Sequence, residues 1–170
     1  MWAYAAPIGS TLALLFVGFV VLRFRLSSLQ KKLKFADQYR ERFIAYCNSI
    51  GRDHEAYTWL ILKSNRMQNE MGGYGVFSVF SPPGGHIRYT NYPIITNMIP
   101  ELRSFIDQNE RSFGAIFAPT IDSYANTIDE ALLRYIGVLG DRELDSIQSL
   151  RNPLLLLRTG VEQLLSAPFI

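Results

Sequence analysis

The sequence has 170 residues, of which 48% are hydrophobic, and its formal net charge is +2. Five of its 17 basic residues precede the first acidic residue, Asp37, which leaves 12 basic against 15 acidic side chains in the rest of the chain. This slight excess of acidic residues argues against nucleic-acid binding, because contact with phosphates needs a basic face. The length has room for one membrane anchor and one compact domain.

The chain opens with an apolar stretch, AYAAPIGSTLALLFVGFVVL, that carries no charge from Ala3 to Leu22. Twenty residues of α-helix rise about 30 Å, which is the thickness of the hydrocarbon layer. We therefore expect residues 1–24 to form a transmembrane anchor, with Trp2 and Tyr4 at the first membrane interface. No Lys or Arg precedes the stretch, which argues against a cleaved signal peptide. A buried core helix is the alternative explanation.

A basic cluster directly follows this stretch. Because positive residues remain on the cytoplasmic side of a membrane, the cluster predicts a single-pass signal-anchor with the N-terminus outside and the C-terminal domain in the cytoplasm. Contact with anionic headgroups is worth on the order of 1 kcal/mol for each charge. A single cysteine, Cys47, and the absence of Asn-x-Ser/Thr sequences fit a reducing compartment. The residues expected at the membrane interface, besides Trp2 and Tyr4, are Arg23, Arg25, Lys31, Lys32 and Lys34.

Small residues within the anchor offer a surface on which two copies of the chain could meet. Gly9, Ala13 and, at a looser spacing, Gly18 would let two helices approach closely. Monomeric anchors often contain such glycines as well. A homo-oligomer is therefore one expectation and a monomer the other.

The remainder, residues 25–170, is expected to be a mainly α-helical bundle. Apolar residues at alternating three- and four-residue steps from Leu26 to Ile50 predict that the anchor helix continues out of the membrane. Asp53 is suited to cap a second helix that Gly72 and Gly73 end. Mutual packing in the bundle explains both apolar stripes, and a parallel coiled-coil dimer is the alternative.

Residues 72–97 change character, because glycines, prolines and aromatic residues interrupt any helical pattern. We expect a long structured loop in which residues 76–80 and 87–89 form a short β-hairpin across the sequence SPPGG.

This loop also carries the candidate binding residues. Arginine and aromatic side chains provide much of the binding energy at recognition surfaces, and long loops in compact domains are often functional. The alternative is an ordered cap whose aromatic residues belong to the core. The residues expected to bind a partner or ligand are His86, Arg88, Tyr89 and Tyr92.

Further helices are expected after the loop. Asn97 is suited to cap the next helix, with Pro100 in its first turn. A long apolar stripe then begins near Pro119 and is closed by Gly140, after which Asp141 is suited to cap a short helix.

The last expected helix covers residues 152–168 and is apolar on most of its surface. Asn152 followed by Pro153 predicts its start, because Asn caps helices and Pro suits the first helical position. The helix either completes the core of the bundle or lies on the membrane surface. Its apolar ending also leaves open that the natural chain continues past Ile170.

No arrangement of residues predicts catalysis, a metal or a cofactor. Cys47 and His54 would suit a cysteine hydrolase only if they lay within hydrogen-bond reach of each other. Residues 73–78 imitate part of a phosphate-binding loop but lack its final glycine and lysine. Two histidines, without paired cysteine motifs, provide no zinc site.

These features predict a membrane-anchored, non-catalytic interaction or scaffolding subunit of a membrane-associated assembly. Its expected partners are the lipid bilayer and another protein, and nucleic acid is not expected. The alternative function is a membrane-linked sensor or effector that binds a small ligand through the 72–97 loop.

Overall fold

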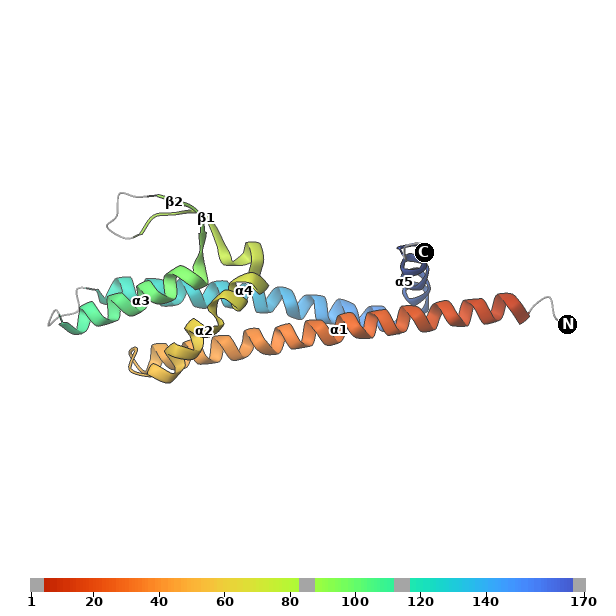
Figure 1. The fold of residues 1–170 in the computed structure, drawn as a ribbon, viewed down its shortest axis with the longest axis horizontal. Helices are drawn as coiled ribbons and strands as arrows, with labels where there is room; N and C mark the ends of the chain where they lie inside the picture. Colours follow the sequence, from red (N-terminus) through yellow and green to blue (C-terminus); the bar gives the residue numbers. More distant parts are fainter. Residues whose placement is uncertain (1–4, 83–87, 112–116, 167–170) are drawn as a thin grey trace. The chain divides into compact units, whose positions relative to one another are not determined.

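The computed structural model describes residues 5–82, 88–111 and 117–166 of the chain. Within these ranges it contains five α-helices, one 3-10 turn and one two-stranded antiparallel sheet (Figure 1). This confirms a mainly helical fold with a long apolar helix at its N-terminal end and a small hairpin in the loop region. The chain divides into two compact units, one of residues 1–33 with 138–170 and one of residues 34–137.

Helix α1, Ala5–Asn48, is continuous, as the apolar stripe predicts. It ends where Ile50 and Gly51 both adopt positive φ angles, of 53° and 75°. A side chain at Gly51 would meet Ile106, since an added Cβ would lie 2.9 Å from its Cγ2 atom. Glycine is therefore required at this turn for both its conformation and its lack of a side chain.

Helix α2, His54–Met71, has the predicted boundaries. The side chain of Asp53 accepts a hydrogen bond of 2.9 Å from the backbone N–H of Ala56, and Gly72 forms the C-cap. The residues that α2 buries recur at the spacing of one helix face, namely Ala56, Leu60, Ser64, Met67 and Met71.

The hairpin follows a 3-10 turn, η2, at Gly72–Gly75. Strand β1, Val76–Phe80, coincides with the predicted strand, and it pairs antiparallel with β2, Tyr89–Pro93. The second strand thus begins at Tyr89, two residues later than predicted, and Ile87 lies outside the described residues. Pro93 at the end of β2 suits a two-stranded sheet, because only an edge strand tolerates a missing N–H donor.

Helix α3, Ile94–Arg111, begins directly after β2, so the prediction of a cap at Asn97 is wrong. The Gln68 side chain accepts a hydrogen bond of 2.9 Å from the N–H of Ile95 and donates one of 2.8 Å to the carbonyl of Gly75. A residue of α2 thereby provides a hydrogen-bond acceptor for a backbone N–H in the first turn of α3. Pro100 consequently lies in the second turn of the helix rather than the first.

Helix α4, Ala118–Arg151, continues through Gly140, so the predicted break there and the cap at Asp141 are wrong. Glycine inside a helix costs about 1 kcal/mol relative to alanine, and burial of the apolar side chains that precede Gly140 in α4 outweighs that cost. The buried residues of α4 are Tyr124, Ile128, Ala131, Leu132, Tyr135 and Leu139.

Helix α5, Pro153–Ser166, follows after one residue. The Oδ1 atom of Asn152 accepts a hydrogen bond of 3.0 Å from the N–H of Leu154, which confirms the predicted helix start.

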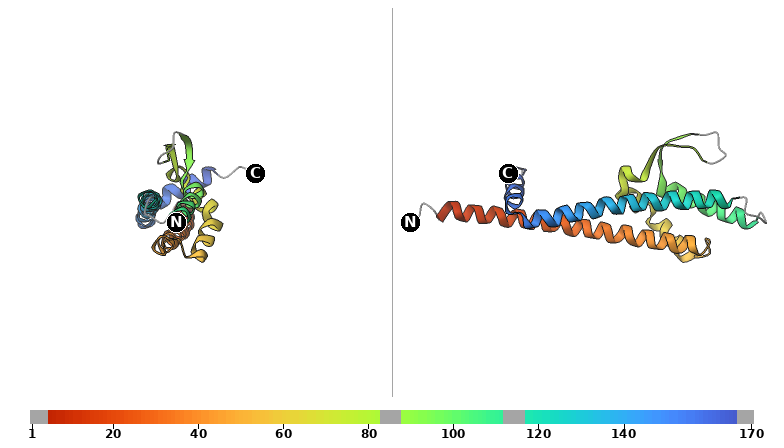
Figure 2. Two further views of the ribbon diagram at one scale, coloured as in Figure 1. Left: turned by 90° about the vertical axis from the view of Figure 1, so that its left-hand side faces the viewer. Right: turned by 180° about the vertical axis from the view of Figure 1, so that it is seen from behind.

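The unit of residues 34–137 contains the second half of α1, α2, the hairpin, α3 and the first part of α4 (Figures 1 and 2). Its core is rich in aromatic and large aliphatic side chains from α1, α2 and α3. Arg40 on α1 also forms a two-pronged ion pair with Asp129 on α4, at 2.7 and 3.1 Å. The most completely buried side chains include Tyr39, Phe43, Tyr46, Leu60, Met67, Ile95, Ile99 and Leu102.

The unit of residues 1–33 and 138–170 brings the first part of α1 together with the end of α4 and with α5. Leu22 and Leu26 of α1 and Leu139 of α4 are buried. Gln30 of α1 donates a hydrogen bond of 2.8 Å to Glu143 of α4.

Candidate functional site

Those of the predicted binding residues that the structure describes fall into two different environments. His86 lies outside the described residues. Arg88 is exposed next to β2, and the Tyr89 side chain is 42% exposed. Tyr92 is only 5% exposed and belongs to the core. Arg88 and Tyr89 are therefore accessible to a partner, whereas the Tyr92 side chain is occupied by a contact inside the protein.

That contact is a carboxylate shared by two tyrosines. The hydroxyl groups of Tyr92 and Tyr124 donate to the two oxygens of Glu101, at 2.8 and 2.9 Å. Burial raises the pKa of both tyrosines, and the hydrogen bond to Glu101 raises it further. Both hydroxyl groups thus remain protonated donors, and they join β2 and α4 to α3.

Aromatic stacking fixes the hairpin to the bundle. The Phe80 ring stacks on Tyr92 with ring centres 4.4 Å apart and meets the Tyr124 ring edge-on at 6.1 Å. Phe77 and Phe80 are also stacked, at 5.7 Å. Phe80 lies opposite Tyr89 at the loop end of the paired strands, and Phe77 lies opposite Tyr92 nearer the base. Because these contacts hold both ends of the paired region, exposed residues such as Val79 and Tyr89 project from a fixed support.

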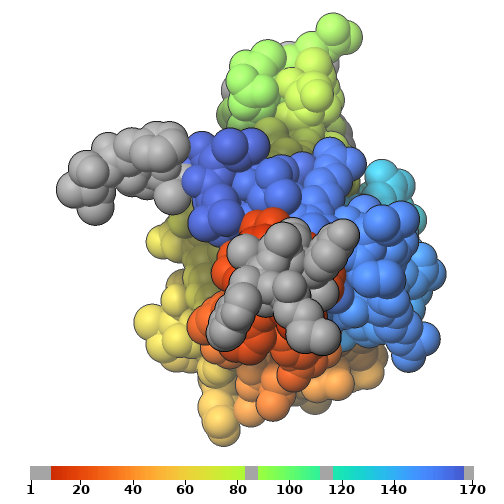
Figure 3. Space-filling view, turned by 90° about the vertical axis from the view of Figure 1, so that its right-hand side faces the viewer, coloured from red at the N-terminus to blue at the C-terminus, as the bar shows by residue number. Residues whose placement is uncertain are grey.

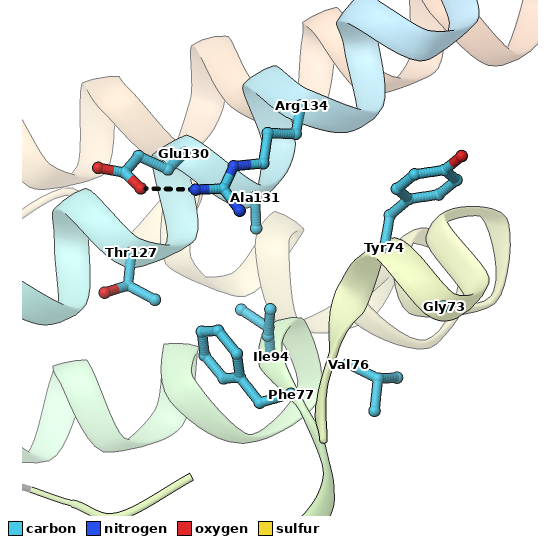
Figure 4. A pocket seen from close by; sticks show the side chains of 9 residues that line it. All are labelled: Gly73, Tyr74, Val76, Phe77, Ile94, Thr127, Glu130, Ala131 and Arg134. Carbon is cyan, nitrogen blue, oxygen red and sulfur yellow. Dashed lines mark hydrogen bonds and ion pairs between the residues drawn. The ribbon is translucent and has the colours of Figure 1, made fainter. Parts of the chain in front are cut away.

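A pocket of about 280 Å³ lies between the start of the hairpin and α4 (Figure 4). Phe77 and Ile94 supply an apolar wall, and Tyr74 lies at one side. Glu130 and Arg134 of α4 form an ion pair of 3.4 Å with largely exposed side chains at the rim. The lining residues are Gly73, Tyr74, Val76, Phe77, Ile94, Thr127, Glu130, Ala131 and Arg134.

Sequence reasoning did not find this pocket. The Gly73–Gly75 turn is visible in the sequence as a glycine-rich fragment, but Thr127, Glu130 and Arg134 lie outside the apolar stripe of α4 and look like ordinary surface residues. Only the folding of the hairpin against α4 brings the two groups together.

Cys47 and His54, the groups considered for cysteine catalysis, lie in different surroundings. Burial, with a further contribution from the Asp129 carboxylate, raises the pKa of the Cys47 thiol to about 12. A thiol with that pKa is almost entirely protonated at neutral pH and is a poor nucleophile. His54 is exposed at the first residue of α2. Among the described residues, no group of three or more His, Cys, Asp or Glu side chains could hold a metal ion.

The residues predicted for the membrane interface lie on α1 or precede it in the sequence. Trp2 and Tyr4 are outside the described residues, and most of the basic cluster is exposed, with Lys32 partly covered. Within the described part of the chain, α1 alone is long and apolar enough to cross a membrane. Large apolar side chains of its first part face outward, including Phe16, which is 68% exposed, and Leu12, Phe19 and Phe24.

The arrangement can therefore support binding at two adjoining places, the exposed hairpin residues and the pocket beside the hairpin base. It offers an apolar helix for insertion in lipid as well. No known protein family, no curated protein and no solved structure matches the chain.

Proposed function

We propose that this chain is a single-pass membrane-anchored helical protein that acts as a non-catalytic interaction or scaffolding subunit of a membrane-associated assembly. The observation that carries the proposal is α1, which runs without interruption from an uncharged apolar segment into the helical bundle. Its outward-facing Leu and Phe side chains would be unfavourable in water, and burying one such side chain is worth about 1.5 to 3 kcal/mol.

The orientation follows from the basic cluster. Arg23 and Arg25 stand at the end of the uncharged segment, and Lys31 and Lys34 follow within the same helix. No basic residue precedes the segment. The positive-inside tendency then places the N-terminus outside and the bundle in the cytoplasm.

The hairpin is the proposed contact surface for a protein partner. Arg88 and Tyr89 are exposed, and the Phe80, Tyr92 and Tyr124 rings hold the hairpin in place. A fixed surface loses less conformational entropy on binding than a free loop. The protonated Cys47 thiol supports a role without cysteine catalysis.

A topology reporter tests the membrane part of the proposal. A reporter that is active only in the cytoplasm, fused after Lys34 or at Ile170, should be active, and the full chain should stay with membranes during alkaline carbonate extraction. Activity only of a reporter specific for the outer side, or release of the chain by carbonate, would overturn the proposal.

Paired substitutions in the hairpin test the contact surface. Arg88→Ala together with Tyr89→Ala should remove a protein that co-purifies with the intact chain in mild detergent, as measured by mass spectrometry. Leu62→Ala with Lys63→Ala is the matched control, because both residues are exposed on α2 away from the hairpin. Equal loss in both variants would contradict a specific role for the hairpin.

The pocket favours a second candidate, a membrane-linked sensor or effector for a small ligand. Its apolar wall and its charged rim at Glu130 and Arg134 match the mixed lining of small-molecule sites. A ligand that binds there should raise the melting temperature of the protein. Filling the pocket through Ala131→Leu should remove that rise while leaving co-purification of a protein partner intact.

A further inference from the structure

Helices α5 and α1 approach each other at two glycines. An added Cβ at Gly18 would overlap the backbone carbonyl of Leu156, and one at Gly160 would overlap the backbone carbonyl of Leu14. Each helix thus places a glycine against the backbone of the other, the kind of close crossing that small residues permit between helices in membranes. The first part of α1 and α5 belong to the same compact unit, and α5 runs across this part of α1 in Figures 1 and 2.

The crossing leaves most of α5 uncovered. Among its described residues only Gly160 is buried, whereas Leu154 and Leu165 are each 74% exposed and Leu164 is 58% exposed. Figure 3 shows α5 in dark blue next to α1 in red. Several leucines exposed on one short helix form an apolar surface, and such a surface indicates contact with a further apolar environment.

The position of the crossing indicates what that environment is. At a rise of 1.5 Å per residue, Gly18 and Leu14 lie roughly 7 and 13 Å before Arg23 along α1, inside the uncharged segment. Helices that lie in the plane of a bilayer bury their apolar face about 5 to 10 Å into the boundary between headgroups and acyl chains. Wherever this part of α1 is inserted, α5 is carried to a comparable depth.

We infer that α5 is a second membrane element, an in-plane helix in the leaflet on the Arg23 side, whose exposed leucines contact lipid acyl chains. This inference rests on the proposed insertion of α1. It adds a lipid-binding surface to a protein whose anchor would otherwise be one helix.

The charged residues of α5 are paired with each other. Arg158 and Glu162 form an ion pair of 2.8 Å one helical turn apart. At 100° per residue, both fall on the side of α5 opposite Gly160, where Leu154 and Leu165 also lie. A pair without net charge is less costly to bring near hydrocarbon than either charge alone, because isolated charges are costly to move out of water.

Fluorescence quenching in vesicles tests the inference on the full chain. Single cysteines that replace Leu154, Leu165, Phe16 or Leu62, in a Cys47→Ser background, would each carry an environment-sensitive dye. The protein would be reconstituted in phosphatidylcholine and phosphatidylglycerol vesicles that contain lipids brominated on their acyl chains. All four positions are exposed, so the labels should not disturb the core. Dyes at 154, 165 and 16 should be quenched several-fold more strongly than the dye at 62.

The outcomes separate the inference from the proposed function. Quenching at position 16 without quenching at 154 and 165 would overturn the inference and leave the anchor in place, with the leucine face then assigned to a protein contact. Absence of quenching at position 16 would overturn the anchor itself, and the inference with it.

Discussion

Glu101 joins three elements through one side chain. Tyr92 of β2 and Tyr124 of α4 both donate to it, and both tyrosines are almost completely buried. Hydrogen bonds to a charged group contribute roughly 1.5 to 3 kcal/mol each, and a buried hydroxyl left without a partner costs about 1 to 3 kcal/mol. The stability of the hairpin base should therefore depend strongly on this one carboxylate.

Replacing Glu101 tests that dependence. Glu101→Ala should lower the free energy of unfolding by about 2 to 4 kcal/mol, because both hydroxyl groups lose their acceptor. Thermal unfolding in mild detergent, followed by near-ultraviolet circular dichroism of the tyrosines, measures the change. The matched control is Glu130→Ala, whose carboxylate pairs with the exposed Arg134 and whose loss should change stability by less than about 0.5 kcal/mol. Similar losses in both variants would contradict a special role for Glu101.

At this scale, the sequence reveals the residues whose partners are close in the chain. Asp53 and Asn152 could be identified as helix caps because each bonds to an N–H two or three residues further on. Glu101 could not be identified in the same way, since its tyrosine partners are 9 and 23 residues distant. Tyr92 was therefore predicted as a binding residue although its hydroxyl is bonded in the interior.

The boundaries of the helices could be predicted where nearby residues set them and could not where a distant residue does. α2 has the predicted boundaries because Asp53 and Gly72 are strong local signals at its two ends. The start of α3 depends on Gln68, a residue of another helix, so the sequence around Asn97 could not show it. Gly140 is a local signal that tertiary packing overrides.

Glycine substitutions distinguish these cases. A Cβ at Gly137 or Gly140 would have no atom within 4 Å, so Gly137→Ala and Gly140→Ala should each raise the free energy of unfolding by about 1 kcal/mol. Gly18→Ala should instead loosen the crossing of α1 and α5, because its Cβ would overlap a backbone carbonyl. Thermal unfolding measures the first effect, and trypsin cleavage at Arg158 in detergent measures the second. A lower melting temperature for Gly140→Ala would show that α4 is interrupted there.

For the whole molecule, the pattern of apolar residues was enough to predict the helical class and the long first helix. The glycines and prolines of residues 72–97, together with the short apolar run at residues 76–80, were enough to predict a hairpin. The pocket beside Phe77 and the crossing of α5 with α1 could not be predicted, because each joins segments that are far apart in the sequence. That the 72–97 loop carries a binding surface stays a prediction, and of its predicted residues Arg88 and Tyr89 are exposed whereas Tyr92 is buried.

The distribution of charge along the chain predicts how the whole protein is oriented. Replacing Arg23, Arg25, Lys31 and Lys34 by Gln, together with Ala5→Arg and Ala6→Arg, should invert a substantial fraction of the molecules. Paired reporters at Ile170, one active in the cytoplasm and one active outside, measure that fraction. The Gln replacements without the new arginines serve as the control and should produce a mixture. An unchanged orientation in both variants would mean that these charges do not set the topology.

The join at Asn152 has a mechanical consequence. A single residue connects α4 to α5, and consecutive Cα atoms are only about 3.8 Å apart, so the last turn of α4 cannot move far from the first turn of α5. With α5 embedded as inferred above, the last turn of α4 is therefore held close to the membrane surface as well.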